Sequence, residues 1–271
     1  AEIDAGTGTG GQLRTFDSDG FSVGSDNSVN KSSENICSWN WKAGGSASSN
    51  SDGNITSSVS VNTTAGFSIV SYTGSSANSN IGTVGHGLGS VPKMLIVKDR
   101  DATSDWLIFN GNLGNNKILE LNDTAAASTD VNAWNNTAPT SSVFTIGDNS
   151  YTNANGRKFI AYCFAEKKGF SKFGSYVGNS NTDGTFVYTG FRPAWVLIKR
   201  ITDTQHWMIG DNKISPFNPT DNMLKADAND AEDTDNHVDF LSNGFKNRIT
   251  GNAFNNSNST YIYMAFAESP F

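Results

Sequence analysis

Short apolar runs alternate with polar segments along the chain, and no segment shows the 3.6-residue period of an amphipathic helix over three turns. The runs VPKMLIVK and RPAWVLIK are apolar at both parities, which predicts strands buried on both faces. Each opens on a Pro, which a strand tolerates at its first position. Each is followed by a polar turn and a second apolar run, DWLIF or HWMIG, which predicts the return strand of a hairpin. Further strands are predicted at residues 117–121, 142–146, 158–164, 185–189, 238–240 and 260–266.

This pattern occurs twice in the sequence, as an internal repeat. The interval from Pro92 to Trp106 is 14 positions, as is the interval from Pro193 to Trp207. FIAYCFAE at 159–166 matches YIYMAFAE at 261–268. The repeat predicts an all-β fold with two tandem homologous β-sandwich-like repeats, at 66–168 and 169–271.

A third copy is cut short at the N-terminal end. FDSDGFSVGSDN at 16–27 resembles FLSNGFKNRITGN at 240–252, and ENICSWNWKA at 34–43 falls where the FAE strands fall. Residues 1–43 are therefore expected to be the C-terminal fragment of a preceding repeat whose front is absent. A piece of this length is too short to bury a core alone, so we expect it to pack on its neighbour or to fray.

The segment 44–65 consists almost wholly of small polar residues, which is typical of a flexible Ser/Gly/Asn-rich linker. Val59 and Val61 alternate with polar residues, so a short edge strand is the alternative. The second junction, from Glu166 to Gly169, is very short, and the two full repeats should therefore sit in a fixed relation.

Composition agrees with a turn-rich β protein. There are 27 Gly and only 17% charged residues, while aromatic residues make up 11% and supply a core. The net charge of −7 argues against nucleic-acid binding, and no apolar run of about 18 residues predicts a membrane-spanning helix. Cys37 and Cys163 lie in apolar runs, where we expect small buried side chains rather than a disulfide.

No catalytic signature stands out. The three His do not repeat, and HExxH, GxSxG and a paired Cys and His are all missing from the sequence. The glycine-rich stretches GTGTGG and GHGLGS lack the preceding strand and following helix of a phosphate-binding loop. The sequence therefore predicts a protein that is not an enzyme.

The acidic stretch DANDAEDTDNHVD, at 227–239, is the strongest candidate for a metal site. Oxygen-rich loops bind Ca²⁺, but the EF-hand spacing does not fit, and a solvated polar loop is the favoured interpretation. No cofactor is predicted, with Ca²⁺ as the alternative; a carboxylate pair for glycoside cleavage is a second alternative. The candidate ligands are Asp227, Asp230, Glu232, Asp233 and Asp235.

Three tryptophans raise the question of sugar stacking. Trp106 and Trp207 occupy equivalent strand positions, which favours a shared core role over a stacking platform. Trp134 lies in a polar loop with Asn135 and Asn136, and the second repeat has no obvious counterpart. These three residues are the candidate binding site, and a Trp134 that tucks back onto the core is an equally open interpretation.

Several long phrases carry a family resemblance. In chain order they are WKAGG, NTTAGFSIVSYTG, TVGHGLGSVPKMLIVK, ILELN, WNNTAPTSSVF, FIAYCFAEKKGFSKFGSY, FVYTGFRPAWVLIKR, VDFLSNGFK and TYIYMAFAESPF. From about residue 16 to residue 271, the chain resembles a repeat family of virion and tail-fibre proteins of tailed, mostly marine bacteriophages. The resemblance implies an extracellular, virion-attached homo-oligomer, a trimer as in tail fibres, in contact with other virion proteins; it brings no catalytic residues.

Three functions follow as hypotheses. The first is a tail-fibre or receptor-binding module that contacts host-surface glycan or protein, with tandem weak sites gaining through multivalency. The second is a purely structural fibre or capsid-decoration segment. The third is a tail-associated polysaccharide depolymerase, supported only by the acidic stretch and Trp134.

Overall fold

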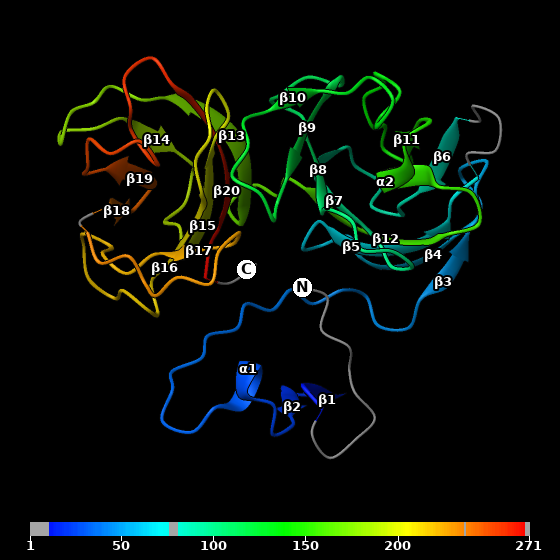
Figure 1. The fold of residues 1–271 in the computed structure, drawn as a ribbon, viewed down its shortest axis with the longest axis horizontal. Coiled ribbons are helices and arrows are strands. Elements are labelled where there is room, and N and C mark those ends of the chain that lie inside the picture. The colour runs from blue at the N-terminus through cyan, green and yellow to red at the C-terminus, as the bar shows by residue number, and fades with distance from the viewer. Residues whose placement is uncertain (1–10, 76–80, 236, 269–271) are drawn as a thin grey trace. The chain divides into compact units, whose positions relative to one another are not determined.

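The fold is all-β, as the sequence predicts. A computed structural model describes residues 11–75, 81–235 and 237–268 and divides the chain into two compact units, Ala1–Trp41 and Lys42–Phe271. Within the described residues, the only helices are α1 (Asn27–Asn30) and α2 (Ser150–Asn153), and all paired strands are antiparallel (Figure 1).

In the described part of the smaller unit, β1 (Leu13–Phe16) and β2 (Phe21–Val23) form a hairpin that is followed by α1. Asp26 caps α1, because its carboxylate accepts the backbone N–H of Ser28 at 2.8 Å. No strand forms at 34–43, where the comparison with the other repeats places one. Cys37 is exposed as a consequence, so the expectation of a buried side chain is wrong for Cys37.

In the larger unit, a first sandwich is built on an eight-stranded sheet with the order β10-β9-β8-β7-β12-β5-β4-β3. A two-stranded sheet of β11 and β6 lies against it. The bounds of these strands are β3 Ser48–Asn50, β4 Ser57–Asn62, β5 Phe67–Thr73, β6 Gly82–Gly85, β7 Pro92–Asp99, β8 Leu107–Asn110, β9 Lys117–Glu120, β10 Ser128–Thr129, β11 Val143–Ile146 and β12 Lys158–Ala165.

A second sandwich follows the same plan. Its large sheet has the order β13-β20-β15-β16-β17, which matches β5-β12-β7-β8-β9 strand for strand. Its small sheet has the order β14-β19-β18. The bounds are β13 Ser171–Val177, β14 Phe186–Tyr188, β15 Trp195–Arg200, β16 Trp207–Asp211, β17 Leu224–Lys225, β18 Val238–Leu241, β19 Gly244–Asn247 and β20 Thr260–Phe266.

Equivalent tyrosines pin the two sandwiches in the same way. The Tyr72 hydroxyl donates to the carbonyl of Thr152 at 2.7 Å, and the Tyr176 hydroxyl donates to the carbonyl of Phe254 at 2.8 Å. Both rings are buried, and burial raises the pKa of each hydroxyl well above its ordinary value. Each tyrosine therefore ties its large sheet to the segment that precedes the last strand of its sandwich, which is α2 in the first sandwich.

The two large sheets pack against each other through the faces that point away from their own cores. Residues of β20 alternate between the core of the second sandwich (Tyr261, Tyr263) and the opposite face, where Ile262 and Met264 are also buried. At this junction the Trp207 indole N–H donates to the carbonyl of Glu120 at 2.8 Å. The result is four sheet layers, with the small sheets outermost (Figure 1). A strand buried on both faces needs apolar residues at both parities, which is what VPKMLIVK and RPAWVLIK supply.

The segment 44–65 is not a flexible linker. It holds β3 and β4, which extend the first large sheet beyond β5. Val59 lies in the core, while Ser58 and Ser60 point to the other face, so the alternation at Val59 and Val61 is a strand signal. Because β3 lies outside β4, β4 is an inner strand and not the edge strand of the sequence prediction.

Candidate functional site

The acidic loop does not gather its carboxylates into one site. The Asp227 side chain is fully buried, 3.0 Å from Nδ1 of His206, and it accepts the backbone N–H of Trp207 at 3.2 Å. It therefore closes the start of β16 rather than facing a ligand. Asp227 is thus a structural acid.

The other acids of the loop are paired separately or exposed. Asp230 forms an ion pair with Lys225, which lowers the pKa of the carboxyl. Asp233 lies 3.1 Å from Nε2 of His237, and the Asp235 N–H donates to Asp233 at 3.3 Å. Glu232 is exposed. Across the described residues, no group of three or more His, Cys, Asp or Glu side chains is arranged to hold a metal ion.

This difference between two acids of one loop is measurable. Asp227→Ala leaves the Trp207 N–H and the His206 ring without their acceptor, so we expect a loss of about 1–3 kcal/mol in the free energy of unfolding. Asp230→Ala removes only an exposed ion pair, and we expect no measurable change. Urea denaturation of both variants tests this, and equal effects of the two substitutions would contradict the assignment.

Trp134 is a core residue and not a surface platform. Only 1% of it is exposed, its ring meets Phe109 edge-on at 5.7 Å, and its indole N–H donates to the carbonyl of Lys117 at 3.2 Å. Asn135 and Asn136 follow with φ of 49° and 47°, a left-handed turn that Asn tolerates better than most residues. The predicted binding trio is therefore a turn that returns the loop to the core, the second of the two interpretations open from the sequence.

The equivalent tryptophans have different environments. Trp207 is buried at the junction of the two sandwiches. Trp106 is half-buried and stacks on Tyr162 at 6.3 Å. The expectation of a core role is confirmed for Trp207 only.

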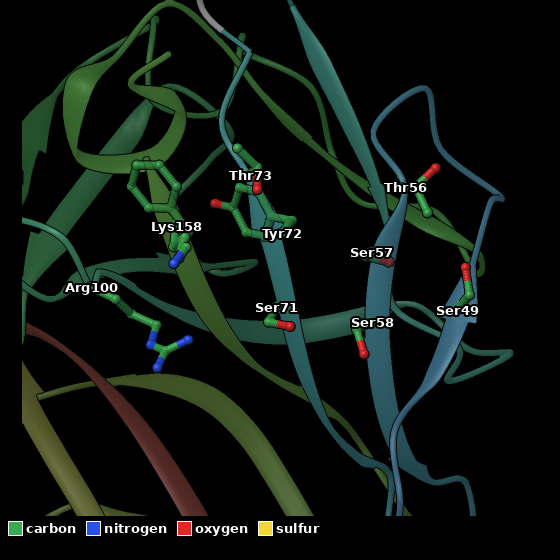
Figure 2. Close-up of a pocket in the computed structure, with 10 residues that line it drawn as sticks. Ser49, Thr56, Ser57, Ser58, Ser71, Tyr72, Thr73, Arg100 and Lys158 are labelled. Atoms are coloured by element: carbon green, nitrogen blue, oxygen red, sulfur yellow. The ribbon is translucent and has the colours of Figure 1, made fainter. Parts of the chain in front are cut away.

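A hollow lies on the first sandwich, at the end of the β4–β5 pairing near Ser58 and Ser71. It measures about 400 Å³ and is open to solvent. We call it the serine groove, because its floor carries a cross-strand row of hydroxyls (Figure 2). It is lined by Ser49, Thr56, Ser57, Ser58, Ser71, Tyr72, Thr73, Arg100, Lys158 and Phe159.

Strand register sets the row of hydroxyls. Ser49 pairs with Ser58, and Ser58 pairs with Ser71, so three serines stand side by side on adjacent strands. Neighbouring strands lie about 4.8 Å apart, so the row spans roughly 10 Å. None of these three side chains makes a hydrogen bond within the described part of the chain.

Two cations stand at one end of the row. Lys158 opens β12, and Arg100 follows β7; the Arg100 N–H donates to the carbonyl of Lys158 at 2.8 Å, which holds the two residues side by side. Figure 2 shows both side chains on the same side of Ser71, with Ser58 and Ser49 leading away from them. The Lys158 ammonium is exposed and has no hydrogen bond or ion pair among the described residues.

Two acids near this end, Asp99 and Asp101, have partners of their own. Asp99 is buried and pairs with Arg157 at 3.0 Å. Asp101 accepts the backbone N–H of Lys158 at 2.8 Å. The side-chain charges here are those of Arg100, Arg157 and Lys158 against two carboxylates, a positive end on a chain of net charge −7.

Sequence reasoning missed this groove. Its serines belong to the segment taken as a linker and to β5, and its cations lie far apart in the sequence, after β7 and at the start of β12. Alternation around Val59 was the one available signal, because a strand there puts Ser58 on the face opposite the core.

The chain belongs to the DUF7483 family, a domain of unknown function, whose family profile matches residues 1–270. No curated protein matches the chain, and no solved structure matches it.

Proposed function

We propose that this member of the DUF7483 family is a non-enzymatic receptor-binding module of a tailed-bacteriophage virion, which contacts glycan on the host surface. The resemblance of residues 16–271 to tail-fibre proteins supports the virion setting. The serine groove carries the binding role, because it presents unpartnered hydroxyls and an exposed ammonium on a sheet.

The scaffold suits a binding surface. The three serines of the row lie on β3, β4 and β5, whose backbones are fixed by ladder hydrogen bonds. A site built on paired strands keeps its geometry better than one built on loops, so less conformational entropy is lost when a ligand binds.

A shallow open site of this kind binds one ligand weakly, and assembly compensates for that. In this proposal the protein is a homo-oligomer, a trimer by the resemblance, held with other virion proteins outside the host cell. Copies joined in one fibre raise the effective concentration of each site for a repeating polymer. No helix in the described ranges is long and apolar enough to span a membrane.

The test is retention of the purified chain on an array of bacterial surface polysaccharides, scored together with polymer length. Retention without shortening is the expected result. Shortening of any polymer would overturn the non-enzymatic assignment and favour the depolymerase. Absence of retention on every polymer would overturn the receptor-binding role.

A second candidate function is a purely structural fibre or capsid-decoration segment. The observation that favours it is the junction of the two sandwiches, where buried aromatic rings fix the modules rigidly. This candidate predicts a large subunit interface and no glycan retention, so the same array separates it from the first.

A further inference from the structure

We propose that the serine groove binds an acidic saccharide, with the Lys158 ammonium holding its carboxylate beside the positive charge of Arg100, and the row Ser49–Ser58–Ser71 hydrogen-bonding its ring hydroxyls. This assignment rests on the proposed receptor-binding function and specifies its ligand class.

The row of hydroxyls matches a saccharide in chemistry. A serine hydroxyl both donates and accepts, as does each hydroxyl of a sugar ring. Ser49, Ser58 and Ser71 offer three such groups at regular strand spacing, and none is committed to a protein partner. The exposed Thr56 and Thr73 add two more at the rim.

The cationic end selects an acid. Arg100 and Lys158 are adjacent through the backbone hydrogen bond between them, so two like charges are held together at the end of the row. A carboxylate placed there gains a charge-assisted hydrogen bond from the Lys158 ammonium and is further attracted by the adjacent Arg100 charge. The charged groups that face this end are Arg157 with its partner Asp99, and Asp101, whose carboxylate already holds a backbone N–H.

The second sandwich provides an internal comparison. In register, Thr260 replaces Lys158 and Ile201 replaces Arg100, with the same backbone hydrogen bond, here 3.0 Å from the Ile201 N–H to the Thr260 carbonyl. Among the described strands its sheet ends at β13, so no strand there corresponds to β3 and β4 with their serines. The same fold therefore stands without the cations and without the hydroxyl row. The groove is thus an addition to the first sandwich and not a requirement of the fold.

The experiment measures binding of the full chain to hexagalacturonate and to maltohexaose, a neutral hexasaccharide, by titration in an NMR spectrum. We expect binding of hexagalacturonate alone, with shifts at Ser58, Ser71 and Lys158. The double variant Arg100→Gln with Lys158→Gln is expected to weaken this binding by about tenfold or more, since it removes the charge-assisted contact and the positive charge beside it. Ser58→Ala with Ser71→Ala is expected to weaken it by about fivefold.

The matched control is Lys93→Gln with Lys168→Gln, which also removes two positive charges, but at exposed positions outside the groove. This control should bind as the wild type does, because a general effect of net charge is screened at moderate salt. The assignment would be overturned if this control weakened binding as much as Arg100→Gln with Lys158→Gln does. It would also be overturned if Arg100→Gln with Lys158→Gln, the groove variant, left binding unchanged. Equal binding of maltohexaose would also overturn it.

Failure here is distinguishable from failure of the proposed function. If the groove variant and the wild type are retained equally on a bacterial polysaccharide, the receptor-binding role stands and this site assignment is overturned. A chain that binds hexagalacturonate through the groove, yet is retained on no bacterial polysaccharide, supports the site and overturns the receptor-binding role.

Discussion

Phe266→Ala is expected to lower the free energy of unfolding by about 3–5 kcal/mol, the usual cost of truncating a buried phenylalanine. The Phe266 ring is the hub of the junction between the two sandwiches. Its centroid lies 6.2 Å from that of Phe164 in the first sandwich, and 5.4, 6.1 and 5.9 Å from those of Phe170, Phe173 and Trp195 in the second. The cavity would be lined by these rings, which are held by two sheets and cannot collapse into it freely.

Phe217→Ala is the matched control, because the same side chain is removed where it is 82% exposed. We expect a change within about 0.5 kcal/mol for this variant. Urea denaturation followed by tryptophan fluorescence gives both values. If Phe266→Ala cost no more than Phe217→Ala, the large sheets would not be packed against each other as described.

The repeated hairpin was predictable because its pattern is local. Its signals all fall within about 20 residues: a Pro, a run apolar at both parities and a polar turn. The hairpins of β7 with β8 and of β15 with β16 lie where these runs predict them. The pairing of β7 with β12 and of β15 with β20 was not predicted, because it joins strands that are distant in the sequence. The reason for burial on both faces was not accessible, since it depends on packing of one sandwich against the other.

The polar segment 44–65 shows the limit of composition. Its residues have the makeup of a linker, but β4 gains its ladder from the free edge of β5, and that partner is not visible in the sequence of the segment itself. Trp134 shows that the polar composition of a loop also fails to predict the burial of a residue within it. A polar loop does not reveal that its one large ring turns inward, because the Asn135 and Asn136 turn is what directs it.

Lys199 could not have been predicted as a buried charge either. Both apolar runs, VPKMLIVK and RPAWVLIK, end on a lysine, and both lysines are buried, but their ammonium groups have different partners. The Lys98 ammonium donates within its own hairpin, to the carbonyls of Asp99 and Ala102. The Lys199 ammonium donates to the carbonyl of Arg200 at 2.9 Å and across the junction to that of Thr124 at 3.1 Å.

The second large effect is expected in how stability depends on pH through Lys199. Burial lowers the pKa of its ammonium to about 8, and the nearby carboxylates of Asp227 and Asp123 offset this in part. Between about pH 8 and the ordinary lysine value of 10.5, the unfolded chain therefore binds a proton that the folded chain has released. Stability from this group rises with pH across that window, and it is lost as the pH falls through 8.

Comparison with Lys199→Met isolates the effect, because buried tyrosines and Cys163, whose thiol pKa burial raises to about 12, titrate alike in both proteins. The free energy of unfolding of the wild type minus that of Lys199→Met should increase by about 3 kcal/mol between pH 7 and pH 10.5. Urea denaturation at half-unit steps measures this difference. A difference that stays flat, or that falls with pH, would mean that the ammonium keeps its charge at the junction at little cost. The two carbonyls of Thr124 and Arg200 would then compensate fully for its desolvation.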